Sequence, residues 1–144
     1  MNWEKIKTQH YFKEPVEHIY TSSIFDSKEY DRLYENQNNL NHQHWQDFDK
    51  QYRTGFTFFE DVNDISLNND VLCLWFFKER SDRGVSTMIN LDGKLITYFP
   101  NAFLITTSKK IKFEEKQEPY IRRPVVQLDM PLDTYNSITS KFQK

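Results

Sequence analysis

Glycine and cysteine are both scarce in this chain of 144 residues. The three glycines are dispersed at positions 55, 84 and 93, whereas the phosphate-binding loops of nucleotide and dinucleotide sites need several glycines close together. The composition therefore excludes both kinds of site. The one cysteine, Cys73, has no partner for an intramolecular disulfide. It lies within an apolar run, residues 71–77, which predicts a buried thiol and favours a reducing compartment.

The chain also lacks a charge excess and a long apolar run. Nineteen Lys and Arg oppose 21 Asp and Glu, which gives a net charge of −2 and makes nucleic acid an unlikely partner. No apolar run approaches the roughly 20 residues that cross a bilayer, so we expect no membrane association. The opening residues, Met-Asn-Trp-Glu-Lys, lead into no apolar segment, so we expect no secretory signal peptide. A cytoplasmic location, or a virion in the case of a viral protein, is the expectation.

Aromatic side chains are abundant, at 16% of all residues. Aromatic and β-branched side chains suit pleated sheet surfaces, so this composition favours a β-rich fold. The mean hydropathy of −0.80 reflects many polar residues, but large apolar side chains occur along the whole chain. We therefore expect one folded domain rather than disorder.

One helix is expected near the N-terminus, over residues 27–40. Asp26 is a good N-cap and Glu29 stands three residues later, the arrangement that satisfies backbone N–H groups at a helix start. Tyr30, Leu33 and Leu40 then recur at helical spacing. Residues 16–21 precede the helix as an expected strand.

From residue 52 onward the pattern predicts strands. Thr87, Ile89 and Leu91 alternate with polar residues, as in a half-buried strand. Asp92-Gly93 is a strong hairpin signal, and Pro100-Asn101 predicts the next corner. The expected strands are residues 52–59, 71–78, 85–91, 94–99, 102–107, 109–114 and 124–130.

This order predicts a mainly β protein with one or two helices, of the α+β class. We expect an antiparallel β-sandwich or jelly roll (a double-stranded β-helix) with the N-terminal helix packed outside. The whole chain, residues 1–144, forms a single domain in this interpretation. Its expected parts are an N-terminal arm (1–15), a strand plus helix (16–51), an antiparallel β core (52–130) and a C-terminal tail (131–144) that contains a short helix.

His42, His44 and Asp47 are the candidate metal ligands. Two imidazoles two residues apart on a strand would point to one face and would share an ion. The simpler interpretation is a polar loop after the helix, with no metal.

Arg80, Arg122 and Arg123 are the candidate anion-binding residues. Guanidinium groups bind carboxylates and phosphates through paired hydrogen bonds. For Arg80 the simpler interpretation is an exposed turn with local Arg–Asp pairing. Residues 109–123 carry six basic and three acidic side chains, so they would face an acidic partner or protect a sheet edge against aggregation. No nucleophile elbow of the Gly-x-Ser-x-Gly kind occurs, and we assign no catalytic residue.

Residues 92–107, DGKLITYFPNAFLITT, followed by residues 120–128, YIRRPVVQL, resemble the late strands of the double-stranded β-helix in 2-oxoglutarate/iron(II) oxygenases. In that family a metal-binding His follows the buried strand, and an Arg at the start of the final strand binds the cosubstrate carboxylate. Arg122 or Arg123 would occupy that position. The family's His-x-Asp or His-x-Glu motif is missing here, and residues 108–111 read Ser-Lys-Lys-Ile. The resemblance thus implies the fold without the iron ligands.

Three functions remain open from the sequence. The favoured one is a non-catalytic jelly-roll module for protein interaction or structure, which uses no cofactor. Its partners would be other protein chains, in a homo-oligomer or in a viral (phage) structural assembly. The first alternative is an oxygenase-like enzyme that uses Fe(II) and 2-oxoglutarate with atypical ligands. The second is a cupin-like module that binds a carboxylate or another anion.

Overall fold

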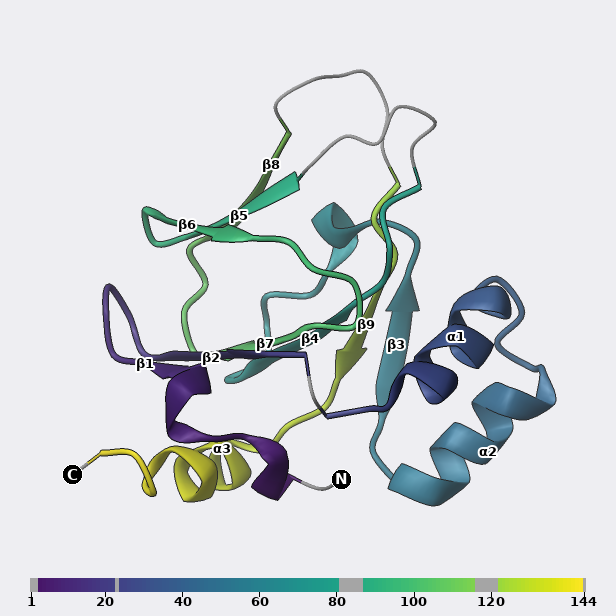
Figure 1. Ribbon diagram of the computed structural model, residues 1–144, viewed down its shortest axis with the longest axis horizontal. Helices are drawn as coiled ribbons and strands as arrows, with labels where there is room; N and C mark the ends of the chain where they lie inside the picture. The colour runs from purple at the N-terminus through teal and green to yellow at the C-terminus, as the bar shows by residue number, and fades with distance from the viewer. Residues whose placement is uncertain (1–2, 23, 81–86, 116–121, 144) are drawn as a thin grey trace.

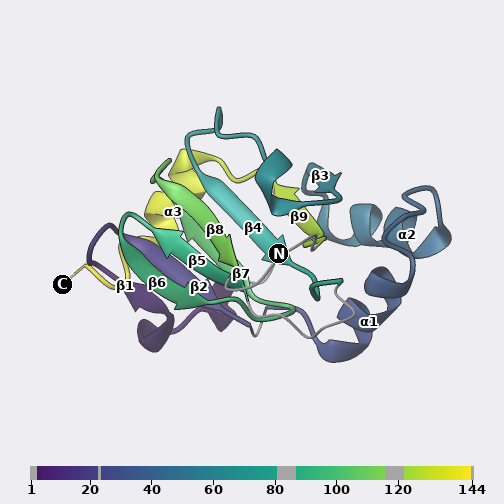
Figure 2. The same cartoon turned by 90° about the horizontal axis from the view of Figure 1, so that it is seen from above.

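The computed structural model describes residues 3–22, 24–80, 87–115 and 122–143. They form two antiparallel sheets and three α-helices in stacked layers (Figure 1). The six-stranded sheet has the order β1-β2-β7-β4-β9-β3, and the three-stranded sheet has the order β6-β5-β8. In Figure 2 the three-stranded sheet is seen lying over one face of the six-stranded sheet. The α+β class and the antiparallel sheets are therefore confirmed.

The strands of the expected β core lie between residues 56 and 128. The helices are α1 (Ser27–Glu35), α2 (Gln43–Tyr52) and α3 (Leu132–Thr139), with short 3-10 turns η1 (Trp3–Lys5), η2 (Thr8–His10) and η3 (Val62–Asp64). The strands are β1 (Tyr11–Phe12), β2 (His18–Thr21), β3 (Phe56–Phe59), β4 (Leu72–Phe76), β5 (Thr87–Leu91), β6 (Lys94–Thr97), β7 (Phe103–Thr106), β8 (Ile111–Glu115) and β9 (Val125–Leu128).

Strand β4 lies near the middle of the six-stranded sheet and is fully buried on both faces. Successive side chains of a strand point to opposite faces, so Cys73 and Trp75 join the cluster under the helices, while Leu74 and Phe76 join the cluster between the sheets. Burial on both sides explains why this segment reads as a continuous apolar run. The predicted burial of Cys73 is confirmed.

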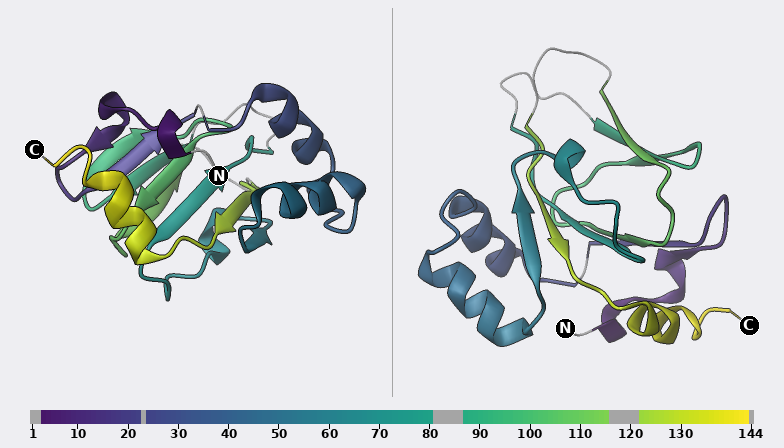
Figure 3. Two further views of the ribbon diagram at one scale, coloured as in Figure 1. Left: turned by 90° about the horizontal axis from the view of Figure 1, so that it is seen from below. Right: turned by 180° about the vertical axis from the view of Figure 1, so that it is seen from behind.

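All three α-helices cover the face of the six-stranded sheet that points away from the small sheet. Tyr30 of α1, Trp45 of α2 and Tyr135 of α3 belong to one apolar cluster with Trp75. Figure 3 shows α3 and the N-terminal turns on this side of the sheet.

The helical region corrects two predictions. Helix α1 begins as expected, because the backbone N–H of Glu29 donates to Asp26 Oδ1 at 2.8 Å. It ends at Glu35 rather than at residue 40, because the side-chain amide of Asn36 donates a hydrogen bond to the Arg32 carbonyl and closes the last turn. Residues 43–52 form a further helix, α2, instead of the expected polar loop or strand. The described residues therefore contain three α-helices where one or two were expected.

Helix α2 also shortens the next strand. Its last residue is Tyr52, and Arg53 leaves the helix in the left-handed region with φ of 49°. Strand β3 consequently starts at Phe56 rather than at residue 52. The spacing of Trp45, Phe48 and Tyr52 is helical and identifies the buried side of α2 in retrospect.

The other local predictions hold within the described residues. Asp92 and Gly93 adopt φ of 51° and 94°, as a two-residue hairpin between β5 and β6 requires. The expected C-terminal helix is α3, and the first expected strand is β2. The expected strand over 85–91 appears as β5 from Thr87, and residues 85–86 lie outside the described part.

The N-terminal arm and the C-terminal tail are tied together by Glu17. Its carboxylate accepts hydrogen bonds from the hydroxyls of Tyr11 and Tyr135 and from the amide of Gln143. Burial alone raises the pKa of Glu17, but these bonds outweigh it and leave the pKa below its ordinary value.

Candidate functional site

The three candidate arginines gather where β4 and β9 approach one another beyond their ends. Arg80 follows β4, and its backbone N–H donates to the carbonyl of Arg122 at 2.7 Å in an isolated antiparallel bridge. Arg122 and Arg123 lead into β9. The structure therefore brings together residues that lie more than forty positions apart in the sequence, but their side chains have different surroundings.

Arg122 and Arg80 make contacts near the surface. The guanidinium of Arg122 lies 3.0 Å from the Glu60 carboxylate, which is 68% exposed. The Arg80 guanidinium donates to the side-chain oxygen of Asn38 at 3.1 and 3.3 Å, with the amide turned so that its oxygen faces the arginine. Exposed pairs of this kind contribute little to stability.

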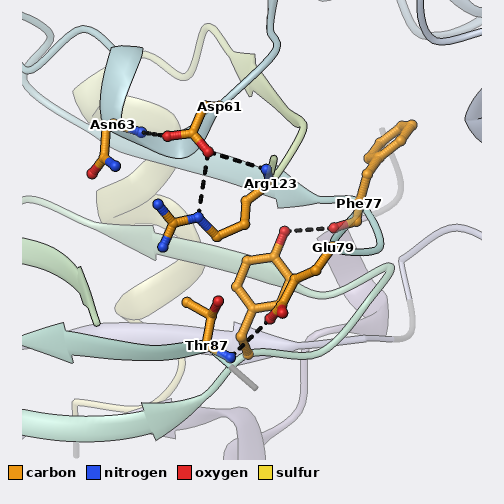
Figure 4. A network of polar contacts seen from close by, with 7 residues as sticks. Asp61, Asn63, Phe77, Glu79, Thr87 and Arg123 are labelled. Carbon is orange, nitrogen blue, oxygen red and sulfur yellow. Dashed lines mark hydrogen bonds and ion pairs between the residues drawn. The ribbon is translucent and has the colours of Figure 1, made fainter. Parts of the chain in front are cut away.

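Arg123 is buried, with 3% of its surface exposed. Its Nε donates to Asp61 Oδ1 at 3.3 Å, and its backbone N–H donates to the same oxygen at 3.1 Å. The other carboxylate oxygen of Asp61 accepts from the backbone N–H of Asn63 at 3.1 Å. Figure 4 shows this carboxylate between the arginine and the start of η3. Asp61 thus supplies a negative charge to the one candidate arginine that is buried.

Further polar groups lie beside Arg123 (Figure 4). The backbone N–H of Thr87 donates to Glu79 Oε1 at 2.9 Å, and the hydroxyl of Tyr98 donates to the carbonyl of Phe77. Glu79 Oε2 and Thr87 Oγ1 are buried and have no hydrogen-bond partner in the described part of the chain. Burial, and after it the negative charge of Glu79, raises the pKa of Tyr98 well above its ordinary value, so its hydroxyl stays protonated at neutral pH.

We call Asp61, Glu79, Thr87, Tyr98 and Arg123 the inner polar cluster. Its bonds join the segment after β3 to the start of β9, and the segment after β4 to the start of β5. Sequence reasoning had identified only Arg123. Asp61 and Arg123 are 62 positions apart, and Tyr98 and Phe77 are 21 apart, so no local pattern connects them. The eight-residue spacing of Glu79 and Thr87 matches no motif.

The candidate metal ligands lie on α2, away from the inner polar cluster (Figure 1). His42 caps the helix, and its ring centroid is 4.8 Å from that of His44. Asp47 Oδ1 accepts instead from the Gln43 amide at 2.7 Å. Within residues 3–143 as far as they are described, no three His, Cys, Asp or Glu side chains gather closely enough to hold a metal ion.

The basic stretch 109–123 is described only in part, because residues 116–121 lie outside the described residues. Lys109, Lys110 and Lys112 are exposed on and before β8, and Lys110 lies 4.0 Å from the Asp92 carboxylate. A surface cavity of about 740 Å³ opens elsewhere, between the start of β3 and the end of β9, and Arg53, Asp70 and Asp129 are among its lining residues. None of the candidate site residues lines it.

Comparison with known proteins gave no match: no family model fits the chain, and neither a curated protein nor a solved structure is significantly similar to it. Among the described helices none has the length and apolarity needed to cross a membrane.

Proposed function

We propose that this chain is a non-catalytic jelly-roll module that binds other protein chains, either copies of itself or components of a viral assembly. The order of strand pairing supports the jelly roll. Hairpin β5–β6 is innermost, β4 pairs with β7 around it, and β3 pairs with β9 outside both. Strand β9 also pairs with β4, and strand β8 pairs with β5, so the nested pairs lie side by side in two sheets. Such nesting results when one long antiparallel ribbon folds over into two sheets.

A complete jelly roll has eight strands in two sheets, and irregular chain replaces one of them here. Residues 60–70, between β3 and β4, would provide the strand next to β8 in a complete roll. They form η3 and irregular chain instead, with Ser66 held by two hydrogen bonds to the Gln127 side chain. The proposal is therefore a jelly roll whose small sheet has one strand fewer.

The interior of the roll is filled by the chain's own side chains, which supports a role in binding rather than in catalysis. Leu74, Phe76 and Leu104 of the large sheet meet Ile89 and Leu91 of the small sheet, and all five are completely buried. Close packing of these described side chains supports a solid interior at this level of the roll.

The pairing of Arg123 with Asp61 is the observation that carries the proposal. In the oxygenases that the sequence resembles, an arginine at this place in the roll binds the carboxylate of the cosubstrate. Here the Asp61 carboxylate lies against that guanidinium at 3.3 Å. An incoming carboxylate would have to compete with Asp61, whose side chain is 21% exposed, for a buried guanidinium that already faces a carboxylate.

The placement of the histidines also supports the proposal. An iron site of the oxygenase type needs two histidines and one carboxylate on converging strands. His18 is the one histidine on a strand of the large sheet, while His42 and His44 lie at the start of α2. These donors do not converge.

Binding of a protein is supported by apolar side chains on the outside of the roll. Leu95 on β6 is 54% exposed and Phe99, just after β6, is 53% exposed. Exposed aromatic side chains such as Phe99 are common anchors of protein interfaces.

The test has a chemical arm and a binding arm. Protein reconstituted anaerobically with Fe(II) is incubated with 2-oxoglutarate and oxygen, and we expect no turnover of 2-oxoglutarate. Its thermal stability is also followed with carboxylic acids, because a ligand at about 100 times its dissociation constant adds about 2.7 kcal/mol. We expect no shift for the native chain. Turnover, or a saturable shift that Arg123→Gln abolishes, would overturn the non-catalytic, ligand-free interpretation.

The binding arm uses the full chain as bait and measures the affinity of each purified partner. The native chain is compared with Leu95→Asp and Phe99→Asp, two exposed substitutions that leave the interior unchanged. We expect both to weaken the partner's binding by about tenfold or more, as for other interface anchors. A chain that binds neither another protein nor itself contradicts the proposal.

A further inference from the structure

The N-terminal arm is held on the large sheet by few backbone contacts. Its strand, β1, is the last strand of that sheet and pairs only with β2, through two residue pairs, one of which sets Phe12 opposite His18. Ahead of β1, Ile6 is buried in the same apolar cluster as Trp75. A two-residue strand at the end of a sheet belongs to the elements that open without unfolding of the rest.

His18 lies beneath this arm and is fully buried. Its ring stacks on Phe12 with ring centroids 5.0 Å apart, and its Nδ1 lies 2.7 Å from the Val16 carbonyl. Nδ1 therefore carries the proton of the neutral ring, and a second proton would go to Nε2. Nε2 is buried and has no hydrogen-bond partner among the described residues, whereas a charged imidazole donates from both nitrogens. The closed arm thus disfavours the charged ring.

The groups packed around His18 do not stabilise a second proton either. Lys94 on β6 is a positive charge that acts on the ring, and its Nζ lies 4.3 Å from the centre of the Phe12 ring. The residues opposite His18 on its two neighbouring strands, Phe12 on β1 and Thr106 on β7, do not titrate. Burial lowers the pKa of His18 below its ordinary value of 6.5, and the charge of Lys94 lowers it further.

Two further titratable groups bear on the arm. The Glu17 carboxylate accepts from the Tyr11 hydroxyl, and its pKa lies below its ordinary value of 4.5, so it stays charged and keeps this bond at pH 5. The ring of His10 accepts from the backbone N–H of Lys7 at 2.9 Å. Because both residues belong to the arm, that bond moves with it. His18 is therefore the group whose protonation opposes the contact between the arm and β2.

We propose that the N-terminal arm is an acid-sensitive latch on β2, which opens when His18 takes up a second proton. This inference goes beyond the proposed function and does not depend on it. Opening removes Phe12 from the His18 ring and gives water access to Nε2. It also removes β1 from the outer edge of β2, and a free edge of this kind accepts a strand from another chain.

The direction of the pH effect follows from proton uptake. In the open state His18 has its ordinary pKa of 6.5, and in the closed state it resists protonation, so a falling pH favours the open state. Between pH 7.5 and pH 5 the equilibrium constant for opening should rise by up to about thirtyfold.

Hydrogen exchange of the full chain, followed by mass spectrometry at pH 7.5 and pH 5, measures this opening. Labelling times are scaled for the effect of pH on an unstructured peptide. We expect the corrected protection of residues 3–12 to fall by up to about thirtyfold at pH 5. The arm should also exchange faster than β4 at both pH values, because β4 exchanges only when the whole chain unfolds. An NMR titration of the native chain should give a pKa below 6.5 for the His18 ring.

Three variants identify the titrating group. His18→Phe keeps a ring against Phe12 but cannot titrate, so the protection of its arm should be the same at both pH values. Lys94→Met keeps an apolar stem and removes the charge, which raises the pKa of His18 in the closed state and should reduce the response. His10→Gln removes the other histidine of this region and should keep most of the response.

The outcomes separate this inference from the proposed function. Equal corrected protection of the native arm at both pH values overturns the latch, and so does exchange of the arm and β4 at one common rate. A response that His18→Phe retains and His10→Gln loses assigns the proton to His10 and overturns it as well. A chain that binds no other protein would contradict the proposed function and leave the latch in place.

Discussion

The indole N–H of Trp75 donates to Asn101 Oδ1 at 2.8 Å, and the same amide donates to the carbonyl of Phe25 at 3.2 Å. Trp75 is the fully buried centre of the helix-side cluster, and Asn101 has φ of 66° at the corner before β7. One residue thus fixes a tight corner and anchors the largest side chain of β4.

Replacing Asn101 by glycine keeps the backbone conformation but leaves the buried indole N–H without an acceptor. We expect a loss of about 1–3 kcal/mol in the free energy of unfolding. Asn101→Ala should lose about 1 kcal/mol more, because a side chain disfavours the left-handed region. Urea unfolding of both variants measures the two contributions. Equal losses for glycine and alanine would show that the backbone at Asn101 is not strained.

The pair Asp61–Arg123 predicts a large effect from a small change. Asp61→Asn removes the charge that faces a buried guanidinium, and we expect the free energy of unfolding to fall by about 3 kcal/mol. Glu60→Gln is the matched control, because its partner Arg122 and its own side chain are partly exposed. That variant should lose less than about 1 kcal/mol. Similar losses for the two variants would mean that burial of Arg123 adds nothing to the pair.

Substitutions at Gly93, in the hairpin between β5 and β6, test backbone strain separately from side-chain packing. A Cβ at Gly93 would meet no atom within 4 Å, but φ there is 94°. Gly93→Ala should therefore cost about 1 kcal/mol through the backbone alone, and Gly93→Asn should cost less, because Asn tolerates positive φ better than Ala. Thermal or urea unfolding gives the comparison. A neutral Gly93→Ala would show that this turn relaxes freely.

What the sequence could predict was local. The Asp26 cap, the Asp92-Gly93 turn and the alternation of Thr87, Ile89 and Leu91 each depend on neighbours within a few residues, and each is confirmed. The predicted end of α1, at residue 40, was wrong because Leu40 continues the helical spacing. The helix ends earlier because the side chain of Asn36 closes its last turn.

Of the candidate site, the sequence could predict only the arginines. Arg123 was identified from its place before the last strand, but its role depends on Asp61, which reaches it through the pairing of β3 with β9. Pairings of this range follow from topology, and no spacing within the sequence encodes them. Tyr98, whose hydroxyl donates to a carbonyl 21 positions away, has no local signal for the same reason.

His18 predicts how stability depends on pH. Its side chain is fully buried on β2, stacked on Phe12 with ring centroids 5.0 Å apart, and its Nδ1 lies 2.7 Å from the Val16 carbonyl. That contact assigns the proton of the neutral ring to Nδ1, and the buried Nε2 has no partner among the described residues. Burial lowers the pKa of His18 below its ordinary value of 6.5, and the nearby charge of Lys94 lowers it further.

Because the folded chain resists protonation of His18, the unfolded chain binds more protons as the pH falls below about 6.5. The free energy of unfolding should therefore be insensitive to His18 above this pH and should decrease below it. His18→Phe keeps the stacking on Phe12 but cannot titrate, so its stability should change less between pH 7 and pH 5, measured by urea unfolding at each pH. If His18→Phe retains that dependence in full, the decline at low pH arises from other groups.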